Sequence, residues 1–195
     1  MGLANQITLA RIALIGPLII AFTWNAPWNM TAALVIFTIA ALTDFVDGWI
    51  ARRRNEVSAL GAALDPIADK LLVATVLVLL VKNGVIGGGH VIAVLIILLR
   101  ELFISGLREA VARTNNALPV TGLAKGKTTF QLIAAGLFLA IAPGGVIAND
   151  TGLRNIALIV LWVAALLTFW TGLQYAMSAT RLLTAPKRTG TPGSE

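Results

Sequence analysis

The sequence predicts an all-α protein that is embedded in a membrane as a bundle of six transmembrane helices. Of its 195 residues, 57% are hydrophobic and only 12% are charged, a balance that soluble domains of this length do not show. Apolar runs recur along the whole chain rather than once at its start, which does not fit a cleavable signal peptide followed by a soluble domain. Short segments rich in Gly, Pro and Asn separate the runs.

The first half of the chain holds three apolar runs, each near the length that crosses the hydrocarbon as a helix. The first covers residues 9–26 and ends at the turn "NAPWN", where Trp24 and Trp28 fit interfacial anchors. The second covers residues 31–51 and ends beside a run of three arginines. The third covers residues 66–82 and ends at "NGVIGGGH", a breaker-rich connector.

The second half continues with runs at residues 91–109, 128–142 and 154–180, the last two joined by the connector "APGGVIANDTG". No internal repeat is evident, so residues 1–182 are predicted to form one transmembrane domain. Residues 183–195 include the Pro-, Gly- and Ser-rich segment "APKRTGTPGSE", which has no apolar period. We expect this tail to be disordered in the cytoplasm.

Basic residues predict how the bundle is oriented. An even number of spans places both termini on one side of the membrane. With the termini in the cytoplasm, thirteen Lys and Arg residues lie at cytoplasmic ends and only two, Lys82 and Arg154, lie outside, as the positive-inside rule requires. Topology and anionic lipid headgroups thus account for the net charge of +6. No aromatic-basic motif indicates binding of nucleic acid.

Four aspartates stand where the second predicted helix should end and the third should begin. Asp44 and Asp47 share one face of the second, and Asp65 and Asp69 lie four residues apart on the third. The intervening loop is short enough to bring the pairs face to face. They could pair with the neighbouring arginines, but Asp44 lies deep in the apolar run, where an acidic group costs about 2.5 to 3.5 kcal/mol. We therefore expect cations to neutralise them.

The available ligand types narrow the choice of metal. The chain has no cysteine and a single histidine, His90, so a thiolate site is excluded. Two divalent cations would balance four carboxylates, and oxygen ligands suit Mg²⁺ or Mn²⁺ better than Zn²⁺. Two such ions can clamp a diphosphate while one of its bonds is displaced in line. The sequence therefore predicts phosphoryl transfer on a lipid.

The acidic stretch also carries a family resemblance. Read as D-x2-D-G-x2-A-R-x8-G-x3-D-x3-D, residues 44–69 match the signature of the CDP-alcohol phosphatidyltransferases without a departure. "NQITLARIALIGP" at residues 5–17 resembles the N-terminal segment of the bacterial members of that family that use glycerol 3-phosphate. "RELFISGLREAVA" and "GLAKGKTTFQ", within residues 100–131, resemble its branch that uses glycerol 3-phosphate. The C-terminal third is similar only in hydropathy.

The resemblance implies six helices around a polar cavity open to the cytoplasm, in a homodimer in the cell membrane of a bacterium. It implies two Mg²⁺ or Mn²⁺ ions, and its four ligands would be Asp44, Asp47, Asp65 and Asp69. The last of these, Asp69, would also be the catalytic base for the acceptor hydroxyl. The nucleotide part of CDP-diacylglycerol would be bound by five residues: Thr8, Arg11, Gly48, Arg52 and Ser58.

Basic residues further along the chain predict a pocket for an anionic acceptor. Arg108, Lys125 and Lys127 lie near the cytoplasmic end without an obvious acidic excess, so they are candidates for binding the acceptor's phosphate. Arg100 is a further candidate, because it belongs to a polar stripe on the fourth predicted helix. Arg100 and Glu101 could instead serve an interhelical ion pair that only orients the bundle.

The sequence allows more than one acceptor substrate and more than one class of protein. The resemblance favours glycerol 3-phosphate, with phosphatidylglycerophosphate and CMP as products, although charge alone fits inositol phosphate equally. Phosphatidylglycerol, the acceptor in cardiolipin synthesis, is another possibility. A cation transporter could use the same carboxylates, but that class places ion ligands near the midplane in both halves of the sequence. Here all four aspartates lie in one half, toward one membrane face.

Overall fold

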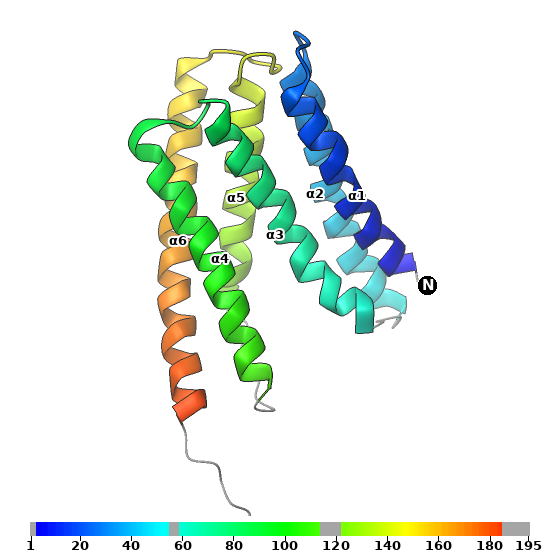
Figure 1. The fold of residues 1–195 in the computed structure, drawn as a ribbon, viewed down its shortest axis with the longest axis vertical. Coiled ribbons are helices and arrows are strands. Elements are labelled where there is room, and N and C mark those ends of the chain that lie inside the picture. The colour runs from blue at the N-terminus through cyan, green and yellow to red at the C-terminus, as the bar shows by residue number, and fades with distance from the viewer. Residues whose placement is uncertain (1–2, 55–58, 114–121, 185–195) are drawn as a thin grey trace, which may run out of the picture.

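The computed structural model describes residues 3–54, 59–113 and 122–184, and within these ranges every regular element is a helix (Figure 1). The all-α fold class is thereby confirmed, and each predicted span corresponds to one helix. The long helices are α1 (Leu3–Thr23), α2 (Asn29–Arg54), α3 (Ala59–Lys82), α4 (Val91–Ala112), α5 (Gly122–Ile141) and α6 (Thr151–Thr184). A 3₁₀ helix, η1 (Gly88–His90), precedes α4.

Most helices extend past the apolar runs that predicted them, because a helix satisfies its own backbone hydrogen bonds whether or not its side chains are apolar. Helix α1 begins at Leu3 rather than at residue 9, and α6 ends at Thr184 rather than at residue 180. Two helix ends fall short of their runs: α5 stops at Ile141, one residue early, and α1 stops at Thr23 although its run continues to residue 26. Pro27 follows closely and disfavours helical backbone at Ala26.

The turn between α5 and α6 is fastened to the start of α2. The backbone N–H and the side-chain hydroxyl of Thr31 both donate to the carbonyl oxygen of Gly144, each at 3.0 Å. Gly144 has a φ of +85°, a backbone conformation that favours glycine. A Cβ atom at this position would also lie only 3.2 Å from the carbonyl oxygen of Pro27.

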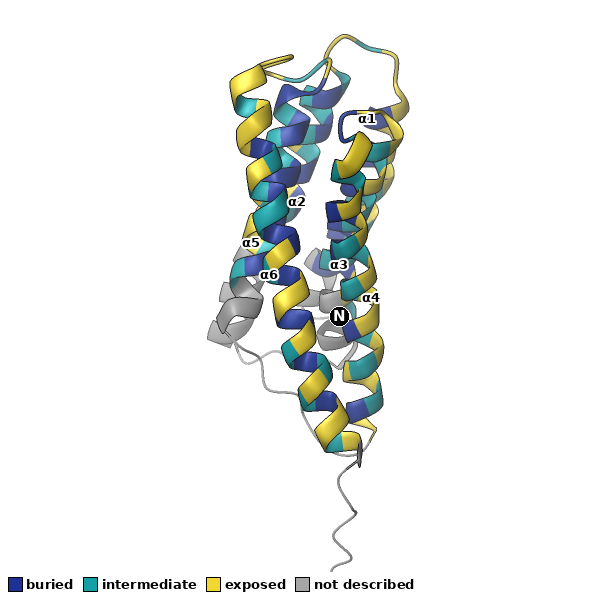
Figure 2. Ribbon diagram, turned by 90° about the vertical axis from the view of Figure 1, so that its left-hand side faces the viewer, coloured by how far each residue is buried: buried dark blue, intermediate teal, exposed yellow. Residues whose placement is uncertain are grey.

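Large aliphatic and aromatic side chains together with many alanines form the core (Figure 2). Small residues allow helices to approach closely, which is how helices associate in membranes. The fully buried alanines of this main core come from several helices: Ala33, Ala40, Ala93, Ala134, Ala135, Ala157, Ala164 and Ala165.

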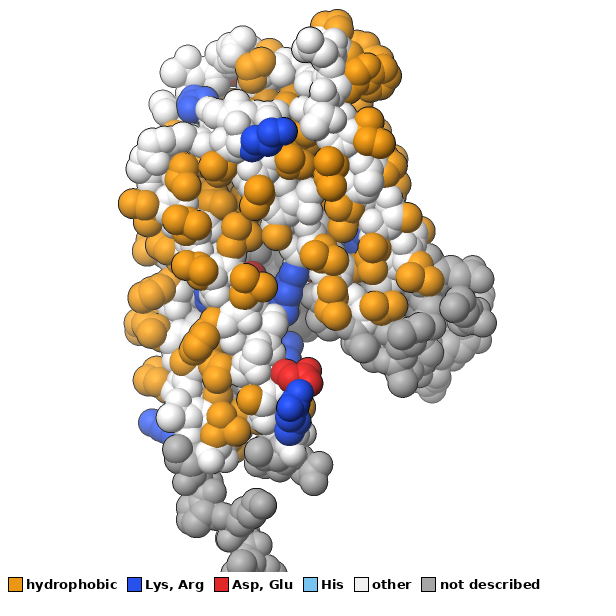
Figure 3. Space-filling model, in the orientation of Figure 1, with side chains coloured by type: hydrophobic (Ala, Val, Ile, Leu, Met, Phe, Trp, Pro, Cys, Tyr) orange, Lys and Arg blue, Asp and Glu red, His pale blue; other side chains and the backbone are white. Residues whose placement is uncertain are grey.

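The outer surface is strongly apolar (Figure 3). On α4 and α6, the exposed large hydrophobic residues include Ile92, Leu95, Leu99, Leu102, Phe103, Ile159, Leu166, Phe169 and Trp170. In the described part of the chain, two helical stretches, Gly88–Ala112 and Thr151–Leu183, are long and apolar enough to cross a membrane. Shorter apolar helical stretches cover Thr8–Thr23, Asn29–Thr43 and Gly126–Ile141. A surface of this kind fits lipid rather than water.

The helices pack unevenly around their common axis. Helix α1 packs on α2, and α5 and α4 both pack on α6, whereas α3 contacts α4 much less closely. Figure 1 shows α3 and α4 near each other at the end where η1 joins them and spreading apart toward the opposite end. That divergence leaves room between the two helices for the cavity described next.

Candidate functional site

A cavity of about 590 Å³ lies among α3, α4, α5 and α6. Figure 3 shows a furrow in the surface between α4 and α3, with basic side chains in it. Most of the lining is apolar, but one set of charged and polar residues faces the cavity: Asp69, Lys70, Arg100, Glu101, Ser105, Arg108, Lys127, Thr128, Gln131 and Tyr175. Four of these are cations and two are carboxylates, so the lining residues that the structure describes carry an excess of two positive charges.

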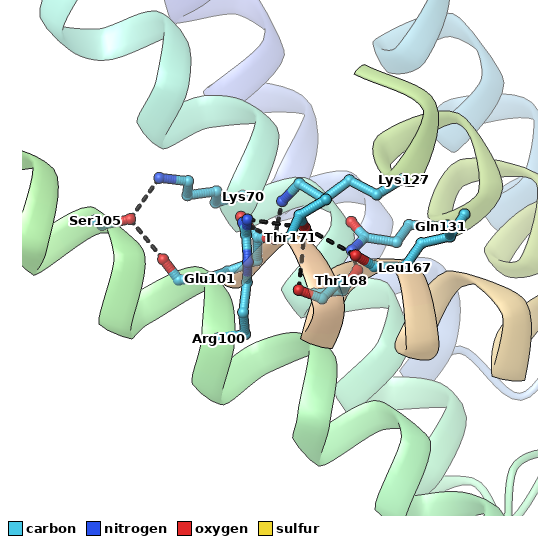
Figure 4. A network of polar contacts seen from close by, with 9 residues as sticks. All are labelled: Lys70, Arg100, Glu101, Ser105, Lys127, Gln131, Leu167, Thr168 and Thr171. Atoms are coloured by element: carbon cyan, nitrogen blue, oxygen red, sulfur yellow. Dashed lines mark hydrogen bonds and ion pairs between the residues drawn. The ribbon is translucent and has the colours of Figure 1, made fainter. Parts of the chain in front are cut away.

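Glu101 is the centre of a network that joins three helices (Figure 4). Its Oε1 accepts a hydrogen bond from Arg100 Nη1 at 3.1 Å and another from Lys127 Nζ on α5. Arg100 Nη2 donates to Thr171 Oγ1 on α6 at 3.0 Å. The cationic side chains are 91–93% buried, since Arg100 and Lys127 expose only 9% and 7%. Buried charges that are paired and hydrogen-bonded fix the relative positions of the helices that carry them.

The network answers the question that the polar stripe on α4 left open. The stripe faces the cavity, and Glu101 also forms an interhelical ion pair, although its interhelical partner is Lys127 and not an arginine. Gly172 on α6 makes room for Arg100, because a Cβ atom there would lie 2.8 Å from Arg100 Cγ. Close approach of this kind is a common reason for glycine inside a helix.

Lys70 reaches from α3 across to α4, where its Nζ donates to Ser105 Oγ (Figure 4). The Ser105 hydroxyl in turn donates to the backbone carbonyl of Glu101 at 2.6 Å. A hydroxyl has one hydrogen, so Ser105 can only accept from Lys70 in this arrangement. This contact spans the side of the cavity where α3 and α4 diverge.

Tyr175 on α6 supports two of the cations. The guanidinium carbons of Arg100 and Arg108 lie 5.6 and 5.7 Å from the centre of its ring, within the range of cation–π contacts. Gln131 both lines the cavity and donates to Thr168 Oγ1 at 2.9 Å.

At its other side the cavity adjoins α1 through an ion pair. Arg11 Nη1 lies 2.8 Å from Asp69 Oδ1, and the Arg11 side chain is fully buried. Thr8, one turn earlier on α1, is also buried. A protein cation therefore neutralises part of the charge of one of the four aspartates, a pairing that spacing along the chain gave no means of predicting.

The described side chains bring together part of the predicted site. Asp69, Arg108, Lys127 and Arg100 all line the cavity. The side chains of the remaining predicted residues lie outside the described set: Asp44, Asp47, Gly48, Arg52, Ser58, Asp65 and Lys125. Helix α2 carries Asp44 and Asp47, and α3 carries Asp65 and Asp69.

The metal site stays a prediction. Among the side chains that it describes, no cluster of three potential ligands is present, and three of the four predicted ligands fall outside that set. The donor chemistry fits a hard divalent cation, because the candidate ligands are carboxylates. Asp69 itself is only partly buried and lines the cavity.

Sequence reasoning did not assign three residues to the site: Lys70 and Tyr175, which line the cavity, and Thr171, which accepts a hydrogen bond from Arg100. Lys70 had been counted only as a marker of topology, although it directly follows Asp69 on the same helix. Thr171 and Tyr175 both lie in the last predicted span, residues 154–180. The four-residue spacing of Thr171 and Tyr175 on α6 is the only signal in the sequence that could have linked them to Arg100.

Comparison with known proteins assigns the class. The family model for CDP-alcohol phosphatidyltransferase matches residues 1–170. The chain belongs to the CDP-alcohol phosphatidyltransferase family and is therefore a transferase.

Curated relatives then point to one branch of the family. The chain is 42% identical over 174 residues to CDP-diacylglycerol–glycerol-3-phosphate 3-phosphatidyltransferase of Rickettsia bellii, covering 89% of this chain and 93% of the relative. Proteins of the same name from Cereibacter sphaeroides and Shigella flexneri are 34% and 35% identical, each over 91% of this chain. They cover 95% and 94% of those two relatives.

Proposed function

We propose that the chain transfers the phosphatidyl group of CDP-diacylglycerol to glycerol 3-phosphate, giving phosphatidylglycerophosphate and CMP. The observation that carries this proposal is the described part of the cavity lining, in which four cations face two carboxylates, Asp69 and Glu101. An excess of two positive charges suits a phosphate monoester, which is close to a dianion at neutral pH. The names of the curated relatives support the same acceptor.

In this reaction, the acceptor hydroxyl oxygen attacks the phosphorus that bears the diacylglycerol. A new bond forms between phosphorus and that oxygen, the bond from phosphorus to the bridging oxygen breaks, and CMP leaves. We assign to Asp69 the removal of the hydroxyl proton, since it lines the cavity that would hold the acceptor. Arg11 fixes the orientation of Asp69 through its ion pair.

Asp44, Asp47, Asp65 and Asp69 would hold two Mg²⁺ or Mn²⁺ ions, which when bound would neutralise the diphosphate and stabilise charge on the leaving group. Gly48, Arg52 and Ser58, with Thr8 and Arg11, would bind the nucleotide part of CDP-diacylglycerol. Arg108, Lys125 and Lys127 would bind the acceptor's phosphate together with Arg100. Lys127 and Arg100 are already oriented by Glu101.

The membrane arrangement is part of the proposal. The six long helices contain 20 to 34 residues, and about 20 helical residues cross the hydrocarbon. We propose six spans in a bacterial cell membrane, with both termini and the opening of the cavity on the cytoplasmic side. The domain would end near residue 182, ahead of a disordered tail, and the enzyme would be a homodimer.

Turnover in detergent tests the acceptor. Purified protein is mixed with CDP-diacylglycerol, Mg²⁺ and one candidate alcohol at a time, and CMP release is followed. We expect CMP release with glycerol 3-phosphate, and its loss when EDTA removes the metal. Turnover with inositol phosphate or phosphatidylglycerol, but none with glycerol 3-phosphate, would contradict the proposal. Family membership favours this chemistry over cation transport.

A further inference from the structure

Lys70 differs from the buried cations around it in how its charge is compensated. Arg100 and Lys127 both pair with Glu101, and Arg11 pairs with Asp69. Among the described residues, no carboxylate lies within 4.0 Å of Lys70 Nζ, whose hydrogen-bond partner is the neutral hydroxyl of Ser105. An ammonium group in a membrane-embedded bundle usually reaches the aqueous interface or pairs with an acid. Lys70 instead lines the cavity.

The hydrogen-bond partner of Lys70, the hydroxyl of Ser105, is a weak acceptor. The hydrogen of Ser105 is used on the backbone carbonyl of Glu101, so Lys70 is held by a lone pair of a neutral oxygen. A phosphate oxygen is a stronger acceptor for an ammonium group, because both partners are charged. Drawing Lys127 or Arg100 toward a ligand would disturb a buried ion pair, whereas drawing Lys70 away from Ser105 gives up only this neutral contact.

The position of Lys70 along the chain sets a distance. It directly follows Asp69, so the two Cα atoms are about 3.8 Å apart, and both side chains line the same cavity. In glycerol 3-phosphate, the attacking hydroxyl and the phosphate lie at opposite ends of a three-carbon chain. When the acceptor's hydroxyl lies at Asp69, its phosphate can therefore reach Lys70 only under two conditions. The acceptor must be short, and it must carry a free phosphate monoester.

We propose that Lys70 is a specificity-determining residue. Its ammonium group gives up the hydrogen bond to Ser105 and binds the phosphate of a short acceptor whose hydroxyl lies at Asp69. This inference rests on the proposed function and adds to it a residue that selects for the acceptor's length and charge. Figure 4 shows Lys70 entering from α3, on the opposite side of Arg100 and Glu101 from Lys127. The acceptor's phosphate is then held between cations from different helices.

Kinetics of Lys70 variants test the proposal. At saturating CDP-diacylglycerol, Lys70→Ala should raise the KM for glycerol 3-phosphate about tenfold or more, the equivalent of one lost charge-assisted hydrogen bond. The inhibition constant of inorganic phosphate, used as a competitor of the acceptor, should rise by a similar factor. Lys70→Arg should retain most of the affinity, and the KM for CDP-diacylglycerol should stay unchanged. Lys82→Ala, on the exposed end of the same helix, is the matched control and should alter none of these constants.

Other kinetic results would overturn either the role of Lys70 or the proposed function, and the two cases can be told apart. An unchanged KM for glycerol 3-phosphate in Lys70→Ala, or an equal rise in both KM values, would remove Lys70 from the acceptor site while leaving the proposed function intact. Failure of the unmodified protein to use glycerol 3-phosphate would overturn the proposed function, and the role of Lys70 with it. If Lys70→Ala cannot be recovered folded from detergent, Lys70→Met keeps most of the stem without the charge and decides the same question.

Discussion

At the end of the bundle that holds the short turns, a pocket of about 230 Å³ is lined by Asn83, Asn149, Asp150 and Arg154 among others. The larger cavity, deeper in the bundle, is lined by Asp69, Glu101 and four cations. Both sites combine acidic and basic side chains, so residue type alone would not tell them apart. They differ in which elements supply the residues and in what those residues bind.

At the turn end, polar groups satisfy the backbone. Asp150 Oδ1 accepts from the N–H of Leu153 at 2.7 Å at the start of α6, and Asn83 donates to the carbonyl of Phe22 at 3.4 Å. Both are ordinary ways to satisfy the unpaired groups at helix ends. The acidic and basic residues of this pocket, Asp150 and Arg154, also balance.

In the larger cavity, polar groups sit in the middle of helices, where no backbone group needs them. They bond to one another across α3, α4, α5 and α6, and among the described lining residues positive charge is in excess. Mid-helix polar residues in a membrane bundle are costly and usually serve function. From this difference we infer that uncompensated charge borne by helices, rather than the presence of charge alone, indicates an anion site.

The largest difference is expected between substitutions of two aspartates, Asp69 in the larger cavity and Asp150 at the turn end. Asp69→Asn should lower the rate of CMP release about 10³-fold, because it removes the proposed base and a proposed metal ligand. Asp150→Asn should leave the rate within about twofold, since asparagine caps a helix as well as aspartate does. Thermal denaturation of both variants controls for folding, because Asp69→Asn also weakens the ion pair with Arg11. Retention of a tenth of the rate by Asp69→Asn would exclude the base role.

A second test concerns the stability of the network. Glu101→Gln leaves Arg100 and Lys127 buried without a carboxylate, and breaking a buried pair in this way costs about 3 to 5 kcal/mol. We expect a markedly lower midpoint in thermal denaturation of the protein in detergent. A midpoint equal to that of the unmodified protein would show that Glu101 does not hold α4 to α5.

The sequence predicted the helices because apolar runs report burial in lipid whatever the tertiary structure is. It also placed Arg100 and Arg108 on one face of α4, since helical spacing is local. It could not reveal that Lys70 crosses to Ser105 or that Arg11 pairs with Asp69, contacts that join residues 35 and 58 positions apart. Such pairings depend on how α3 lies against α4 and α1. The ends of the helices differ from the ends of the predicted apolar runs because backbone hydrogen bonding continues beyond the apolar residues.

A smaller difference is expected between substitutions of two arginines, Arg108 in the larger cavity and Arg154 in the pocket at the turn end. Arg108→Ala should raise the KM for glycerol 3-phosphate about three- to tenfold, since Arg108 lines the cavity but is exposed, which weakens its interaction with an anion. The KM for CDP-diacylglycerol should not change. Arg154→Ala, which alters the balanced pocket at the turn end, should leave both constants as they are. Equal effects of the two variants would contradict the distinction between the pockets.

The smallest expected effect contrasts two glutamates of α4. Glu109 pairs with Arg113 one turn later at 3.3 Å, but both side chains are mostly exposed, at 70% and 78%. Glu109→Gln should therefore change the free energy of unfolding by no more than about 0.5 kcal/mol, because water and salt screen such a pair. Measured beside Glu101→Gln under the same denaturing conditions, it isolates the contribution of burial, since the substitution and the helix are the same. A loss of stability in Glu109→Gln that matched Glu101→Gln would mean that removing any acid from α4 has the same cost, and that the cavity network has no special part in holding the bundle together.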